Sequence, residues 1–141
     1  MASKRKSVIF SDELLLLFQQ CEIHPDFLKD IKDAMKRKRG TDFFVVFEKQ
    51  LRTLVTERKN AVLTSPDFER LSHVNGLLCS MHINSAKSGN FRVLYAIQKD
   101  IFLLCGFEEI SGKNNTDYSK PSRKAIKRLK ELQEGTCLEK E

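Results

Sequence analysis

The sequence lacks the features that mark a membrane protein, a metal protein or a disulfide scaffold. No apolar run in its 141 residues approaches the roughly 20 that span a bilayer. None of its four cysteines lies in a CxxC pair, and no HxxxH or HxH spacing occurs, so a metal site has no support. A phosphate-cradling glycine loop and internal repeats are also missing. We therefore expect one cytoplasmic domain over residues 1–141, without metal or cofactor.

Positive charge is what the chain has in excess. Lysine and arginine number 25 against 19 acidic residues, which gives a net charge of +6. One segment near the C-terminus has six basic residues and no acidic one: Lys120, Arg123, Lys124, Lys127, Arg128 and Lys130. Such a segment favours an anionic partner. The alternative is a basic surface that is simply solvated.

The spacing of apolar residues predicts an α+β fold. Residues 1–66 are mainly helical in pattern, residues 77–107 alternate as strands do, and residues 120–134 form a basic amphipathic helix. After a short strand at Ser7–Phe10, three helices are predicted at Asp12–Gln20, Pro25–Arg39 and Thr41–Lys59. The strands of an antiparallel meander are predicted at Leu77–Ile83, Phe91–Ile97 and Ile101–Phe107. We expect the N-terminal helices to pack on one face of this sheet.

Three segments of the meander carry a family resemblance. They read LLCSMHI (77–83), GNFRVLYA (89–96) and IFLLCGF (101–107). Together they resemble the RelE/HigB toxins of the RelE/ParE superfamily. The resemblance implies a compact antiparallel sheet with N-terminal helices on one face and a C-terminal helix. It also implies a type II toxin that cleaves mRNA, often on the ribosome, and a cognate antitoxin partner. The alternatives are a non-enzymatic inhibitor of a protein such as DNA gyrase, and an inactive relative that binds RNA or a partner.

Two residues of the meander suit metal-independent RNA cleavage. That reaction needs a group to accept the 2′-hydroxyl proton, cations for the developing charge and a donor for the leaving oxygen. Arg92 alternates with Phe91 and Val93, so its planar fork points away from the apolar face. If Ile83 pairs with Phe91, His82 lies opposite Arg92 with Cβ atoms about 5 Å apart. The alternatives are a structural ion pair for Arg92 and a histidine without a role.

Further site residues are predicted outside the strands. The resemblance implies a catalytic or phosphate-binding role for Lys113. It also implies that Tyr118, just before the last helix, stacks on a base or donates a proton. Lys87 in the hairpin loop is a candidate contact to the RNA backbone. On the last helix, the predicted RNA-binding residues are Lys120, Arg123, Lys124, Lys127 and Arg128.

Glu108 and Glu109 depart from the family pattern. Many relatives have lysines directly after the third strand, where this sequence has two carboxylates. Two carboxylates would repel RNA unless they turn away or pair with a cation such as Lys113. The helical part before the meander also has three predicted helices where small relatives have two.

Overall fold

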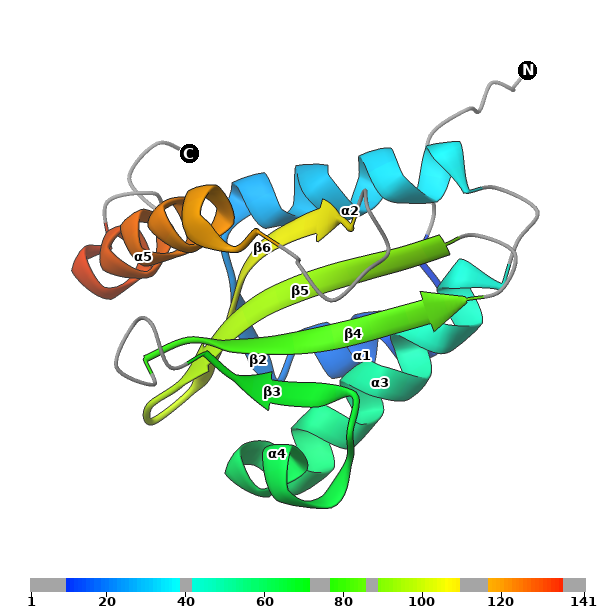
Figure 1. Ribbon diagram of the computed structural model, residues 1–141, viewed down its shortest axis with the longest axis horizontal. Coiled ribbons are helices and arrows are strands. Elements are labelled where there is room, and N and C mark those ends of the chain that lie inside the picture. Colours follow the sequence, from blue (N-terminus) through cyan, green and yellow to red (C-terminus); the bar gives the residue numbers. More distant parts are fainter. Residues whose placement is uncertain (1–9, 39–41, 72–76, 86–88, 110–116, 136–141) are drawn as a thin grey trace.

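The computed structural model describes residues 10–38, 42–71, 77–85, 89–109 and 117–135, which form a five-stranded sheet flanked by helices (Figure 1). In chain order the elements are α1 (Asp12–Phe18), β2 (Cys21–Ile23), α2 (Pro25–Arg37), α3 (Phe43–Glu57), η1 (Arg58–Asn60), α4 (Ala61–Thr64), β3 (Phe68–Arg70), β4 (Cys79–Ser85), β5 (Gly89–Ile97), β6 (Ile101–Glu108) and α5 (Ser119–Glu134). The strand order across the sheet is β2-β6-β5-β4-β3. The predicted α+β class is confirmed.

The predicted helices are present, and local chemistry explains where they begin. The Ser11 hydroxyl accepts a hydrogen bond from the Leu14 amide and caps α1. Pro25 stands at the first position of α2, where its missing N–H costs nothing. The third helix ends at Glu57 because Arg58 adopts a φ of 55°, and the chain continues as η1 and α4. The strand predicted at Ser7–Phe10 lies almost wholly outside the described residues.

The three strands of the meander are confirmed, but the sheet is larger than the sequence predicted. Two three-residue strands, β2 and β3, flank the meander on its two sides. The prediction of a purely antiparallel sheet is wrong, because β2 pairs parallel with β6 through Cys21↔Ile101 and Ile23↔Leu103. β2 precedes the meander in the chain, yet it lies beside β6, the last strand of the meander, on the side away from β5 (Figure 1).

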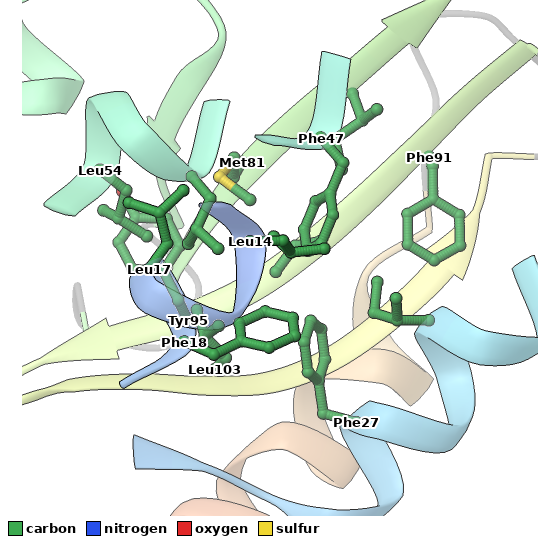
Figure 2. Close-up of a cluster of buried hydrophobic side chains, with 14 of the residues drawn as sticks. Leu14, Leu17, Phe18, Phe27, Phe47, Leu54, Met81, Phe91, Tyr95 and Leu103 are labelled. Carbon is green, nitrogen blue, oxygen red and sulfur yellow. The ribbon is translucent and has the colours of Figure 1, made fainter. Parts of the chain in front are cut away.

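The two faces of the sheet bury two separate apolar clusters. The N-terminal helices cover one face, where Phe27, Phe47 and Leu54 meet Met81 and Tyr95 from the strands (Figure 2). This arrangement confirms that the N-terminal helices share one face. On the opposite face α5 packs Ala125 and Leu129 against Leu94 and Leu104, which explains why β6 is apolar at successive positions. We call these the helical face and the α5 face.

Gly106 lets the meander close tightly around a phenylalanine. A Cβ atom at this position would lie 2.8 Å from the Phe91 ring, closer than real Cβ contacts come. The Phe91 ring in turn meets Phe43 of α3 edge to face, with centroids 5.3 Å apart. A residue without a side chain is therefore required where the sequence reads Cys-Gly-Phe (105–107).

An ion pair between α2 and α5 lies along the edge of β6, beyond the short stretch of β6 that pairs with β2. Arg128 donates from Nη1 to Asp30 Oδ2 at 2.9 Å and to the Leu104 carbonyl at 2.8 Å. Asp30 Oδ2 also accepts from the Gly106 amide at 3.0 Å. The β5–β6 register shifts after Leu94, which leaves Leu104 opposite no residue of β5. Asp30 and Arg128 thus form the hydrogen bonds that a neighbouring strand would otherwise provide to the Gly106 amide and the Leu104 carbonyl.

We expect Asp30→Ala to destabilise the protein by about 2 to 3 kcal/mol, because it leaves the buried Arg128 charge uncompensated. Urea unfolding monitored by circular dichroism measures the change. Asp33→Ala, an exposed aspartate of the same helix, is the matched control and should stay within about 0.5 kcal/mol of wild type. Equal stability of the two variants would contradict a role for this pair at the β6 edge.

Candidate functional site

A polar cluster lies on the α5 face of the sheet, beside the apolar area that α5 covers. Its members come from β3, β4, β5, the end of β6 and the residue before α5: Glu69, Ser80, His82, Arg92, Glu109 and Tyr118. In the β4–β5 register His82 is paired directly with Arg92, so their predicted adjacency is confirmed. Met81 and Val93 point to the helical face. His82 and Arg92 are their neighbours along the strands, so their side chains point to the opposite face, the α5 face.

Glu69 is a member of the cluster that the sequence analysis missed. Its Oε1 lies 3.3 Å from His82 Nε2, and its side chain is half exposed. Glu69 reaches this place because β3 pairs with β4 in a register that sets it opposite Ser80. The run Phe-Glu-Arg (68–70) is too short to show strand alternation. No pattern within this segment could have indicated the contact.

The surroundings of His82 favour its neutral form. Burial and the nearby positive charge of Arg92 lower the pKa of the His82 imidazole, and the Glu69 carboxylate opposes them only in part. The pKa therefore lies below the usual 6.5. A neutral imidazole at neutral pH is able to accept a proton.

Arg92 is held by a buried carboxylate. Its Nη2 donates to Glu109 Oε1 at 2.5 Å, and the two side chains are 11% and 2% exposed. The ion pair that the sequence left as an alternative for Arg92 is therefore present. The Nε and Nη1 atoms of Arg92 are buried and have no hydrogen-bond partner among the described residues. Two of its donors thus lie buried beside the ion pair with Glu109.

Glu108 faces away from the polar cluster. It accepts hydrogen bonds from Arg37 at 2.6 Å and 3.1 Å, and the Lys38 ammonium lies 3.4 Å away. Partial burial alone would raise the pKa of Glu108, but the hydrogen bonds and charges of Arg37 and Lys38 hold that pKa below its usual value. Of the two carboxylates that depart from the family pattern, only Glu109 lies in the cluster.

Tyr118 joins the cluster from the residue before α5. Its hydroxyl donates to Ser80 Oγ at 3.2 Å, and its ring meets Phe107 edge to face at 5.9 Å. Burial raises the pKa of Tyr118, while Ser80 and Arg92 oppose that rise. The phenol is thus protonated at neutral pH and close enough to feel the charges of Arg92, Glu69 and Glu109. The structure places the predicted Tyr118 together with His82 and Arg92.

The basic helix presents five of its six cations to solvent. Lys120, Arg123, Lys124, Lys127 and Lys130 are exposed and form no salt bridge with any described residue. Arg128 was expected on the same surface, but it is buried against Asp30 and Leu104. Position 128 falls on the apolar stripe of α5 with Ala125 and Leu129, so the Arg128 side chain points toward the edge of the sheet instead of into solvent. Lys87 and Lys113 lie outside the described residues.

The remaining reactive side chains form no second site in the described part of the chain. No group of three or more metal-ligating side chains occurs there. Burial raises the pKa of Cys21 to about 12 and that of Cys105 to about 11, and it also raises the pKa of Cys79. These thiols are protonated at neutral pH and are poor nucleophiles. Among the described residues, no helix is both long enough and apolar enough to cross a bilayer.

Comparisons with protein-family models, with curated proteins and with solved structures found no match.

We expect NMR titration to find the imidazole of His82 with a pKa below 6.5 in the wild-type protein. Arg92→Gln removes a positive neighbour and should raise that pKa, whereas Glu69→Gln removes a negative one and should lower it further. Imidazole proton shifts followed against pH give both values, with His82→Asn to assign the signal. Arg52→Gln, on the distant helix α3, is the control that should change nothing. A His82 pKa unaffected by either neighbour would contradict the cluster.

Proposed function

We propose that this chain is a RelE/HigB-like toxin of a type II toxin–antitoxin system and cleaves mRNA without a metal ion. The observation that carries the proposal is the pairing of His82 with Arg92 on a sheet face that also holds Glu69 and Tyr118. The sequence segments of the meander resemble this family, and the α+β architecture is consistent with it. An imidazole, a guanidinium, a carboxylate and a phenol together supply the groups that the reaction needs.

The proposed reaction assigns one role to each side chain. The neutral His82 imidazole accepts the proton of the RNA 2′-hydroxyl, and the 2′-oxygen attacks the adjacent phosphorus. Glu69 holds the ring and stabilises the imidazolium that forms. Arg92 stabilises the charge that develops on the phosphoryl oxygens. The 5′-oxygen leaves with the electrons of its bond to phosphorus and takes a proton from Tyr118, which leaves a 2′,3′-cyclic phosphate.

The exposed cations of α5 bind the phosphate backbone in this proposal. Five of them are exposed and unpaired among the described residues, and Tyr118 directly precedes the helix that carries them. Contacts of this kind position a nucleic acid and carry little sequence preference. mRNA is the proposed substrate, and the ribosome and a cognate antitoxin are the proposed partners in the cytoplasm. Lys113 remains a predicted catalytic or phosphate-binding residue, and Lys87 remains a predicted RNA contact.

The buried pair of Arg92 with Glu109 favours a second candidate function. A guanidinium that is committed to an internal carboxylate is less available to a scissile phosphate. The second candidate is therefore a non-enzymatic relative that binds a protein such as DNA gyrase, or an inactive one that binds RNA or a partner protein. The two candidates differ in whether expression of the chain produces cuts in mRNA.

We expect expression of the chain to arrest growth and to produce ribosome-dependent cuts in mRNA, detected by primer extension. Arg92→Ala should reduce cleavage about 100-fold, because it removes the main cation at the reacting phosphate. Arg52→Ala, on helix α3 and away from the cluster, is the matched control and should cleave normally. Growth arrest with intact mRNA and blocked supercoiling would instead support the gyrase inhibitor, and no toxicity at all would exclude both kinds of toxin.

Glu109→Gln tests whether the internal carboxylate limits the site. Removal of its charge should make the Arg92 donors available and increase RNA affinity about tenfold, with cleavage rising in parallel. Glu108→Gln is the matched control, because Glu108 pairs with Arg37 outside the cluster. Fluorescence anisotropy with a short single-stranded RNA measures the affinity. A loss of cleavage in Glu109→Gln, with the fold intact by circular dichroism, would contradict this prediction and show that cleavage needs the Glu109 carboxylate.

A further inference from the structure

A cavity of about 230 Å³ lies on the helical face, on the other side of the sheet from the polar cluster. Its walls come from η1, α4 and the three strands β3, β4 and β5. Across these strands Arg70 pairs with Cys79, and Cys79 pairs with Tyr95, so the three residues form one row on the same face. The cavity is therefore independent of the RNA site proposed above.

The inner wall of the cavity contains a buried phenol. Tyr95 is 1% exposed, and its ring lies among the core side chains (Figure 2). The Tyr95 hydroxyl lies beside the Cys79 thiol, and its oxygen atom is buried. Burial raises the pKa of both groups, so both are protonated and uncharged. The inner wall of the cavity is therefore uncharged.

Two cations without carboxylate partners border the same cavity. Lys59 and Arg70 are exposed, line it and form no salt bridge with any described residue. Arg70 lies close enough for its charge to lower the pKa of the Cys79 thiol against the effect of burial. No acidic side chain lines the cavity in the described part of the chain. The lining therefore favours a negatively charged ligand.

The turn that carries Lys59 is tied to the sheet, and the wall beside the two cations is apolar. Lys59 belongs to η1, whose first residue, Arg58, donates from Nη2 to the Lys99 carbonyl at 2.8 Å and ties this turn to the β5–β6 loop. Val62 of α4 and Ile97 of β5 supply aliphatic surface between the cations and the phenol. A ligand that fits must therefore combine an anionic group with a small apolar body.

We propose that this cavity binds a small organic carboxylate with an apolar body of one ring or a short chain. Its carboxylate would pair with Arg70 and Lys59. Its apolar body would lie against Val62 and Ile97. A volume of about 230 Å³ suits a ligand of this size, because pockets for drug-sized molecules measure roughly 300 to 1,000 Å³. Such a ligand would bridge η1 and α4 to the sheet.

The test is a titration of the full chain with benzoate and with hexanoate, followed by ¹H–¹⁵N correlation spectra. We expect saturable shifts at the backbone amides of Arg70, Cys79 and Tyr95, and weaker binding of the uncharged benzamide. Lys59→Gln combined with Arg70→Gln should weaken binding about tenfold, because it removes both cations that would pair with the carboxylate. Lys32→Gln combined with Lys36→Gln, two exposed lysines of α2, is the matched control and should bind as wild type does.

Three results would overturn this proposal. One is the absence of saturable shifts with either carboxylate, and another is equal binding of benzoate and benzamide. The third is unchanged affinity in the Lys59 and Arg70 double variant, whose surface substitutions leave the core intact. A failure of RNA cleavage would not affect any of these readouts, because the cavity and the polar cluster occupy opposite faces of the sheet.

Discussion

The ion pair between Asp30 and Arg128 is the interaction on which the arrangement of both sheet faces depends. It joins α2, which packs on the helical face, to α5, which packs on the other, around the end of β6. The same two side chains bond the Gly106 amide and the Leu104 carbonyl. A second contact, His24 Nε2 to Glu131 Oε1 at 2.7 Å, links the same two helices one turn further on. Since Tyr118 directly precedes α5, the docking of this helix also sets the position of the Tyr118 phenol in the polar cluster.

The sequence predicted those parts of the fold that local patterns determine. The alternation of apolar residues in β4 and β5 sets their faces, and the two strands pair from Cys79↔Tyr95 to Ser85↔Gly89. The adjacency of His82 and Arg92 was therefore predictable, and the structure confirms it. The partners of these two residues were not predictable in the same way. Glu69 reaches His82 from a three-residue strand, and Glu109 meets Arg92 where β6 ends, so neither contact follows from periodicity.

Long-range ion pairs explain the other differences between expectation and structure. Arg128 has the spacing of a buried position on α5, yet its charge suggested a surface role, because nothing in the sequence reveals Asp30 as its partner 98 positions earlier. Glu108 similarly finds Arg37 across 71 positions. Charge alone thus overestimates the basic surface by one residue, whereas Glu108 turns away from the cluster, which is one of the alternatives that the sequence left open. Composition predicts that such pairs exist, whereas tertiary structure decides which residues form them.

The shortness of the two outer strands has a consequence for the protein in concentrated solution. An outer strand exposes unpaired backbone groups that can recruit a strand from a second molecule. Here β2 and β3 each contribute only three residues, and Glu22, Glu69 and Arg70 place exposed charges along them. A second chain would find few backbone groups to pair with and would have to desolvate these charges. Among the described residues, these two outer strands are therefore poor templates for edge-to-edge aggregation.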